Sequence, residues 1–565
     1  MNANTCAKPS GTLDRFVFRK GCLEEILARF AARDGLSFLQ IANSVDLRKG
    51  LVAQGYQDIP KSGTGVAMKI SKFAQGLVAK NKEEIGWCKQ TIKPSIVFDE
   101  WTSCASKRFV NIVLLGDCNF WNLGLIRILG SATAQHCLSL VKERLRLYNV
   151  NFYNDIACII TDGCNVMKGI GTIIKPVHQQ LCFAHAIQLA VVKTLYTEQV
   201  SSPSGMETNV AEDDEVYESD DDEGSGGIIL EKEKPVRFND VYGPLIKKVR
   251  ATVSIFRRSP LKNEVLQKYS KSEIGKELKL IMDCKTRWNS LCVMLARCLE
   301  MKYCILFAQI ELKINPLLSE DDFDKIKQIC DVLEPTKKTV ELLCRRDANL
   351  IKTDAALLFL LDHLQEMQTS VSVDLYTNLV SEIQARRTIA SDALKYLHCG
   401  NIKSKIFQHL RIHTPSKRQA ITFIISLASK FTDDLVEFMD EQEDEDIRDE
   451  EPAKKAKLDF SKAINLAFNE SMQSKPADGQ ETNVSKHDEI ATEVQLFEMN
   501  GKLHRGPNLE FVYKSLLSVT PTSVESERAF SAAGYLCNKF RSRLSDENLN
   551  NLLFLRAHFQ KENQN

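Results

Sequence analysis

Three acidic residues are the strongest candidates for chemistry in this 565-residue chain. Asp99 and Asp162 each end a short apolar run, PSIVFD and IACIITD, that is typical of a buried strand. A carboxylate at the end of such a strand lies at the rim of the sheet, where ligand sites form. Two carboxylates on neighbouring strands can share a divalent cation, because hard cations prefer oxygen ligands. Glu527, in the helical stretch SERAFSAAG, is the candidate third ligand.

A carboxylate trio of this kind suits phosphoryl transfer. In two-metal sites the cations lie about 3.5–4 Å apart and hold the attacking and the leaving oxygens. The strand-end pattern also fits simpler roles, because an Asp after an apolar run is often a turn residue or a helix cap. The residues taken alone leave both interpretations of Asp99 and Asp162 open.

The segment that contains the two aspartates has the pattern of a mixed sheet with helices. Three β-rich runs, PSIVFDEWTS, RFVNIVLLG and FWNLGLIRILG, follow one another and are separated by turn residues. Next come an amphipathic helix over TAQHCLSLVKERLRLYNV, the strand that ends at Asp162 and the apolar stretch LCFAHAIQLAVVKTLY. Three consecutive strands predict a meander, and the later helix and strand predict a crossover onto the same sheet.

The rest of the chain has helical periodicity, interrupted by two polar stretches. We therefore expect an α/β plus all-α fold in six regions. These are a helical N-terminal region (1–92), the first part of an α/β core (93–199), an acidic disordered linker (200–234), an all-α insertion (235–432), an acidic and basic disordered linker (433–488) and a C-terminal helical segment (489–565).

The charge balance hides an uneven distribution. The chain has 74 Lys and Arg and 74 Asp and Glu, so its formal net charge is zero. Residues 207–223 and 433–451 together hold 22 carboxylates and one arginine, which leaves 52 acidic and 73 basic residues elsewhere. A body with a net charge of +21 is what a polyanionic partner requires.

Cysteine usage and hydropathy indicate the compartment. None of the 17 cysteines forms a C-x-x-C pair, so we expect buried free thiols in a reducing environment. No apolar run approaches the 18 or so residues that a membrane span needs, and no secretory signal follows Met1. The sequence predicts a soluble intracellular protein that does not associate with a membrane.

Five motifs resemble those of the hAT superfamily of DNA transposases. They are FDEWTS (98–103), TDGCNVMKGIG (161–171), CFAHAIQLAV (182–191), TRWNSLCVML (286–295) and PTSVESERAFSAAG (521–534). Their order and approximate spacing are similar to the family's, and the resemblance covers about residues 20–560. It implies an RNase H-like core that is interrupted by a long all-α insertion.

The resemblance assigns the carboxylates a role. Asp99, Asp162 and Glu527 align with the family's three catalytic carboxylates, which would hold Mg²⁺ or Mn²⁺ in an active enzyme. Glu525 competes by residue type, but the Glu-Arg pair of the motif places the family residue at Glu527.

Two further motifs imply contacts with DNA. Cys182 and His185 match the family's C-x-x-H element, which is thought to act near the DNA; without two further ligands it is not a zinc site. Arg287 and Trp288 match the family's R-W element, whose Trp is associated with a flipped or hairpin DNA end. Without that context, a Trp on a helix is more often a core residue.

The C-terminal segment resembles the hAT dimerisation region. Helices this apolar must pack on their own core or on a partner, and the family context favours both. The residues concerned are Phe530, Leu549, Leu552, Leu553, Phe554 and Leu555.

The family's N-terminal BED-type zinc finger is not expected here, because the first 135 residues contain five Cys but no His. Whether such a finger was lost or lies outside this chain stays open. Cys399, His409 and His413 have C-x₉-H-x₃-H spacing, but one Cys is too few to predict zinc. Basic stretches elsewhere could still contact DNA phosphates without reading sequence.

A short basic run bears on location. Lys454, Lys455 and Lys457, in EEPAKKAKLD, are similar to a monopartite nuclear import signal, and they predict a nuclear protein.

Two functions follow from these patterns. The first is a hAT-type transposase that binds DNA, self-associates and performs metal-dependent strand transfer, and it is favoured by the presence of all three carboxylates. The alternative is a catalytically inactive, domesticated nuclear scaffold that dimerises, and it is favoured by the missing finger. A truncated or recently mobile copy would explain both observations.

Overall fold

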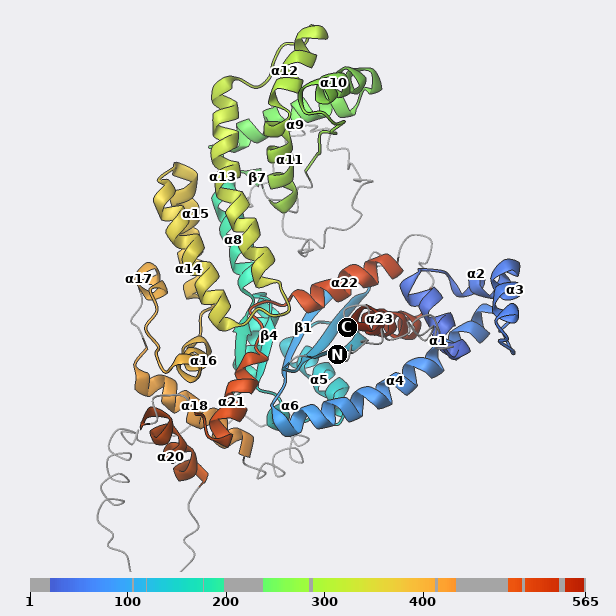
Figure 1. Cartoon of the computed structure of the whole chain (residues 1–565), viewed down its shortest axis with the longest axis vertical. Coiled ribbons are helices and arrows are strands. Elements are labelled where there is room, and N and C mark those ends of the chain that lie inside the picture. The colour runs from blue at the N-terminus through green and yellow to red at the C-terminus, as the bar shows by residue number, and fades with distance from the viewer. Residues whose placement is uncertain are drawn as a thin grey trace, which may run out of the picture.

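The computed structural model describes residues 21–103, 106–117, 119–175, 177–197, 237–283, 288–411, 415–432, 486–499, 504–537 and 544–562. Helices make up most of these residues, and one five-stranded sheet lies among them (Figure 1). The prediction of a mixed α/β fold with many helices is confirmed. None of the described helices is both long enough and apolar enough to span a bilayer.

The five-stranded sheet has the order β3-β2-β1-β4-β5. Its strands are β1 (Ser95–Thr102), β2 (Arg108–Leu115), β3 (Phe120–Arg127), β4 (Cys158–Thr161) and β5 (His178–Leu181). The first three form the predicted antiparallel meander, and β4 and β5 join β1 in parallel. The crossover to β4 contains α5 (Ala134–Leu147) and α6 (Phe152–Asp155), and α7 (Asn165–Ile173) connects β4 to β5.

Two details of the sheet differ from the sequence-based expectation. The pattern does not predict β5, because its residues HQQL have no apolar alternation; its buried Gln180 is satisfied by hydrogen bonds from its amide to two backbone carbonyls. Asp99 does not end β1 but lies inside it, because the next three residues continue to pair with β2.

The two faces of β1 lie against different cores, because successive residues of a strand point to opposite sides. Ile96 and Phe98 face a core that includes α5, α7 and the long helix α4 (Gly63–Thr91). Val97 faces a second core that includes α8 (Phe183–Leu195) and the helical insertion. Asp99 shares the face of Val97, so its carboxylate lies on the side of α8.

Short helices from the N-terminal region pack against the C-terminal end of the described chain. They are α1 (Leu23–Ala28), the π-helix η2 (Arg29–Arg33), α2 (Phe38–Asn43) and α3 (Val45–Ala53). Together with α4 they share a core with α22 (Val524–Leu536) and α23 (Asp546–Glu562). Segments from the two ends of the sequence therefore form one unit beside the sheet (Figure 1).

Helix α23 also covers the free edge of β3. The side chain of Asn550 accepts a hydrogen bond from the backbone N–H of Leu125 at 2.8 Å. This approach depends on Gly124, which has a φ of +97° and on which a methyl group would clash with Asn550. A backbone N–H on the edge strand β3 thus bonds to a helix, and the helix covers an edge that could otherwise pair with another strand.

Between β5 and α22 the described chain is almost entirely helical. The two-residue strands β6 (Tyr196–Thr197) and β7 (Arg237–Phe238) pair where the chain leaves and re-enters this part. The helices are α9 (Gly243–Arg257), α10 (Pro260–Glu273), α11 (Trp288–Glu300), α12 (Lys302–Glu311), α13 (Glu320–Leu343), α14 (Leu350–Met367), α15 (Ser370–Gln384), α16 (Ile389–Cys399), α17 (Ile406–Leu410), α18 (Lys417–Thr432), α20 (Lys486–Met499) and α21 (Pro507–Leu517).

These helices, called the helical arm below, lie beside the sheet and extend past it, with α18, α20 and α21 at one end (Figure 1). Helices α9 to α12 lie at its far end, and α13 carries the chain back towards the sheet (Figure 1). The predicted linker 200–234 and residues 433–485 of the second predicted linker lie outside the described residues. The exact division of the chain into six regions stays a prediction.

Candidate active site

Asp99 and Asp162 occupy equivalent positions on neighbouring parallel strands. Val97 of β1 pairs with Ile160 of β4, and each aspartate follows two residues later. Both carboxylates therefore lie at the same level and on the same side of the sheet. Asp162 lies directly beyond β4 and accepts a hydrogen bond from the backbone N–H of Cys164 at 3.2 Å. The structure thus brings together the two aspartates that the sequence singled out.

Helix α22 adds Glu527 on this side of the sheet. Trp101, two residues after Asp99 on the same face of β1, stacks on Phe530 of α22 with 6.0 Å between ring centroids. Phe530 lies three residues after Glu527, one helical turn along the same face. The stacked pair therefore holds Glu527 beside the aspartates, although the insertion separates them in sequence.

Cys182 joins the three elements that carry the site. Its backbone N–H donates to the carbonyl of Thr161 at 2.9 Å, which continues the pairing of β4 with β5. Its Sγ accepts a hydrogen bond from the backbone N–H of Ser523 at 3.4 Å, just before α22. The thiol is fully buried, so in this conformation Cys182 contacts only protein atoms.

His185 lies in the first turn of α8 and faces the carboxylates. Its Nδ1 is 3.9 Å from Oε1 of Glu527. Burial by itself lowers the pKa of His185, but Cys182, Glu527 and Asp99 together raise it to about 10. A positive charge at His185 therefore offsets part of the negative charge around it.

The pKa values of two of the carboxyl groups are raised, as expected for buried groups of like charge that lie close together. Burial is the main cause that raises the pKa of Asp99 well above its usual range, and the charges of Asp162 and Glu527 raise it further. Burial likewise raises the pKa of Glu527, and Asp162 adds to the effect. Such perturbed carboxyl groups are concentrated at functional sites.

The structure distinguishes Glu527 from its competitor Glu525. Both lie on α22 and are buried to a similar degree. The carboxylate of Glu525 is paired with Arg346 at 3.0 Å and with Arg528, so its charge is neutralised within the protein. Both oxygens of Glu527 are buried without a hydrogen-bond partner among the described residues. Only Glu527 is therefore available as a ligand.

These donors fit a hard divalent cation in type and charge. Mg²⁺ and Mn²⁺ are bound by carboxylate oxygens, and the orphaned oxygens of Glu527 are of this kind. The hydroxyls of Ser523 and Ser526, on either side of Glu525, are also buried and unpartnered in the described part of the chain. No group of three metal-ligating side chains is gathered closely enough among the described residues to hold a metal as it stands.

The tryptophan of the R-W motif is the first residue of α11 and lies away from solvent. Trp288 is 4% exposed and belongs to the core of the helical arm, as the alternative interpretation of this residue expects. Its role in handling a DNA end stays a prediction. Arg287 lies outside the described residues, as do Lys454, Lys455 and Lys457 of the nuclear import prediction.

The residues predicted for dimerisation are buried in this chain's own core. Their exposed fractions lie between 0% and 5%, and they pack with α1, η2 and α4. The set comprises Phe530, Leu549, Leu552, Leu553, Phe554 and Leu555. They therefore pack on this chain's own core, which is the first of their two expected roles, and their part in an interface between protomers stays a prediction.

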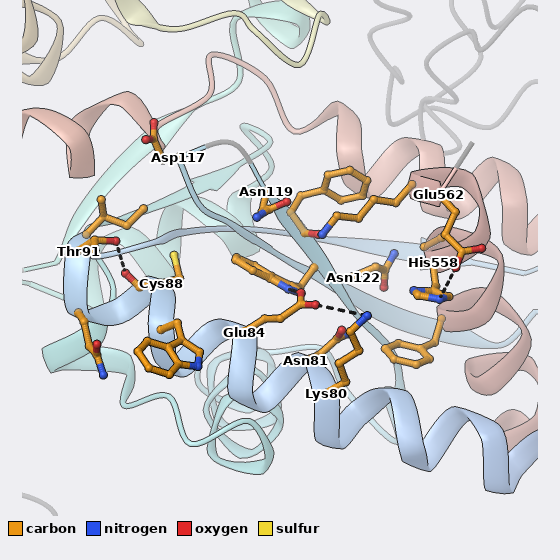
Figure 2. A pocket seen from close by; sticks show the side chains of 18 residues that line it. Lys80, Asn81, Glu84, Cys88, Thr91, Asp117, Asn119, Asn122, His558 and Glu562 are labelled. Carbon is orange, nitrogen blue, oxygen red and sulfur yellow. Dashed lines mark hydrogen bonds and ion pairs between the residues drawn. The ribbon is translucent and has the colours of Figure 1, made fainter. Parts of the chain in front are cut away.

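A cavity of about 740 Å³ lies elsewhere, between α4, the turn that joins β2 to β3, and α23 (Figure 2). None of the three carboxylates lines it. Two pairs of its charged groups face each other, Lys80 with Glu84 at 3.8 Å and His558 with Glu562 at 3.4 Å. Asp117 and Lys561 add one charge of each sign to the lining, which therefore favours no ligand of one charge, and we assign the cavity no ligand.

Sequence reasoning missed the residues that assemble the site rather than act in it. Trp101 lies within the motif FDEWTS, so its position two residues after Asp99 was a usable signal for a stacking partner. Ser523 and Ser526 lie in the motif around α22, close to Glu525 and Glu527. Their nearness to these glutamates in the sequence was a usable signal for polar side chains at the site. The pairing of Arg346 with Glu525 depends on tertiary packing, and no sequence pattern indicates it.

Comparisons with known protein families agree with this architecture in two segments. Residues 496–559 match the hAT family C-terminal dimerisation region. Residues 240–332 match the ZBED1 RNase-like helical domain. No curated protein matches the chain.

Proposed function

Since its two matched segments identify this chain as a protein derived from a hAT-family transposase, we propose that it binds DNA and catalyses divalent-metal-dependent strand cleavage and transfer. One observation carries the proposal. Asp99, Asp162 and Glu527 converge from two strands and a helix, and the two oxygens of Glu527 are buried without a partner. Two buried carboxylates, Asp99 and Glu527, beside the half-buried Asp162 are costly in a structural core, whereas a cation site requires such a cluster.

In this mechanism Asp99, Asp162 and Glu527 would hold the metal ions, and other residues keep these carboxylates in place. Mg²⁺ or Mn²⁺ bound there would activate a water molecule and then a 3′-hydroxyl, and would stabilise the leaving oxygen of the phosphodiester. Trp101 and Phe530 fix the helix that carries Glu527. His185 supplies a positive charge beside Glu527 while the cation is absent.

The arrangement of the sheet supports an RNase H-like core as part of this proposal. Three antiparallel strands are followed by two parallel ones, and the third carboxylate comes from a helix that follows the insertion. The net charge of +21 outside the two acidic windows supports DNA as the partner.

A nicking assay tests the catalytic proposal. The full chain is incubated with supercoiled plasmid and Mn²⁺, and the relaxed product is measured by gel electrophoresis. We expect the wild type to nick, Asp162→Asn and Glu527→Gln to lose the activity, and Glu525→Gln, the matched control on the same helix, to keep it. Absence of nicking by the wild type, or equal nicking by Asp162→Asn, overturns the proposal.

A second candidate function is a nuclear scaffold that dimerises without catalysis. The match of residues 496–559 to a dimerisation region favours it, because self-association does not need the carboxylates. Light scattering on the full chain measures self-association, and the nicking assay on the same sample separates the candidates. A dimer that never nicks DNA, with or without its carboxylates, supports the scaffold.

Nuclear location belongs to both proposals. Lys454, Lys455 and Lys457 carry it, and a fluorescent fusion of the full chain tests it. We expect nuclear fluorescence that spreads to the cytoplasm when the three lysines are replaced by alanine; an unchanged distribution argues against this signal.

A further inference from the structure

A buried arginine of the helical arm reaches the turn that carries Asp162. Arg386 lies between α15 and α16 and is 4% exposed. Its carbonyl accepts a hydrogen bond from Gln180 of β5 at 3.1 Å, which fixes its backbone against the sheet. Its Nη2 faces Gly163, on which a methyl group would lie only 3.0 Å from that nitrogen. The guanidinium therefore packs on the one residue of the turn that has no side chain.

The charge of Arg386 is only partly balanced. Its Nη1 pairs with the carboxylate of Glu382, but Lys193 shares the same carboxylate at 2.6 Å. The Nε of Arg386 is buried and has no hydrogen-bond partner among the described residues. The next residue differs: Arg387 is paired with two carboxylates of its own. A buried guanidinium with spare hydrogen-bonding capacity is costly unless it has a further purpose.

We infer that Arg386 is a positioning residue for the turn formed by Asp162 and Gly163. Through it, the helical arm fixes the direction of a carboxylate in the proposed metal site. The turn itself is held by the hydrogen bond from the Cys164 N–H to Asp162 at 3.2 Å. The guanidinium, pinned by Glu382 on one side, supports Gly163 and keeps this hydrogen bond in place. The inference deepens the proposed function and rests on it.

Binding of Mn²⁺ alone to the full chain, followed by electron paramagnetic resonance, tests this role. Outer-shell groups that orient metal ligands typically change metal affinity about 10–100-fold. We expect Arg386→Lys, Arg386→Gln and Gly163→Ala each to weaken Mn²⁺ binding by about tenfold or more. Lys193→Met is the matched control: it removes the other cation on Glu382 without touching the turn, and we expect it to bind Mn²⁺ like the wild type.

The direction in which Mn²⁺ affinity changes shows whether Arg386 acts by positioning the turn or only through its positive charge. If Arg386 acted only through its charge, Arg386→Gln would bind Mn²⁺ more tightly and Arg386→Lys would be unchanged, because a nearby cation repels a metal ion. Either result overturns the inference. Gly163→Ala leaves Arg386 in place, and so keeps the test valid if an arginine variant fails to fold.

Hydrogen exchange in the metal-free chain supplies a readout that needs no metal. We expect the Cys164 amide to exchange at least several-fold faster in Arg386→Lys and Gly163→Ala than in the wild type and in Lys193→Met. Equal exchange overturns the inference. If the wild type binds no Mn²⁺, or Asp162→Asn binds it equally well, the proposed function fails, while hydrogen exchange still decides whether Arg386 holds the turn.

Discussion

Replacing Glu527 and Glu525 in turn by glutamine separates two acidic residues that the sequence leaves in competition. The substitutions are chemically identical, and both positions lie on α22 with 8% and 9% of their surface exposed. The carboxylate of Glu525 is paired with two arginines. Neither carboxylate oxygen of Glu527 has a hydrogen-bond partner among the described residues. The two variants should therefore change the stability of the metal-free protein in opposite directions.

The expected magnitudes follow from these surroundings. Burial penalises the ionised form of Glu527, and glutamine removes that penalty while losing the attraction to His185. We expect Glu527→Gln to gain about 1 kcal/mol in unfolding free energy at neutral pH, the lower end of the cost of an unsatisfied buried polar group. Glu525→Gln loses charge-assisted contacts to Arg346 and Arg528, which are 33% and 40% exposed, so screening limits the loss to about 1–2 kcal/mol.

The pH dependence follows from the direction of the pKa shift. Since the native state raises the pKa of Glu527, it binds this proton more tightly than the unfolded chain does. The associated stability is complete below the unfolded pKa of about 4.3 and is lost as the pH rises through the folded-state pKa. The advantage of Glu527→Gln over the wild type should thus be small near pH 4 and grow towards neutral pH.

Urea unfolding followed by circular dichroism, with EDTA or with saturating Mg²⁺, is the assay. A ligand at about 100 times its dissociation constant stabilises the folded state by about 2.7 kcal/mol. We expect this gain in the wild type and in Glu525→Gln but not in Glu527→Gln. The reasoning is refuted if Glu527→Gln destabilises the metal-free protein as Glu525→Gln does, or if it keeps the full stabilisation by Mg²⁺.

Three further predictions test the supports of the site. Asn550→Ala leaves the N–H of Leu125 without an acceptor and should lower the unfolding free energy, measured in urea, by about 1–3 kcal/mol. Asn550→Asp keeps an acceptor and should be about as stable as the wild type. Equal losses of stability in the two variants contradict this role of Asn550. With a pKa of about 10, His185 should make the metal-free protein less stable as the pH rises from about 6.5 to about 10, and His185→Gln should lack this slope; an unchanged slope argues against a charged imidazole. Leu555→Ala should lower the unfolding free energy by about 2–5 kcal/mol because Leu555 is a core residue, and light scattering should still show the wild-type oligomer under folding conditions; loss of the oligomer without loss of stability would place Leu555 at the interface instead.

Much of the sheet could be predicted because its strands are apolar and regularly spaced. The meander and the crossover follow from the alternation of strands and helix, and they place Asp162 directly after a strand. The strand β5 could not be predicted, because its polar residues are satisfied by partners that only the fold brings near, on α7 and in the helical arm. The extension of β1 beyond Asp99 likewise depends on pairing with β2.

The candidate site was only partly visible in the sequence. The strand patterns indicate Asp99 and Asp162, but Glu527 emerged through the resemblance to a family, since nothing local distinguishes it from Glu525. The difference between the two glutamates is tertiary: arginines from outside and inside α22 neutralise only one of them. Arg386 carries no motif, and its place beside Gly163 depends on how the linker between α15 and α16 docks.

The apolar C-terminal residues show a similar limit. Their spacing predicts burial, and they are buried. Which surface covers them depends on the N-terminal helices, at the other end of the chain.

The most direct test of the central claim is the anomalous scattering of Mn²⁺ in a crystal of the full chain. We expect an anomalous difference peak within coordination distance of oxygens from Asp99, Asp162 and Glu527, and no such peak in Asp162→Asn. A wild-type crystal soaked in Mn²⁺ with no peak among these three carboxylates, or with Mn²⁺ on Glu525 instead, would contradict it.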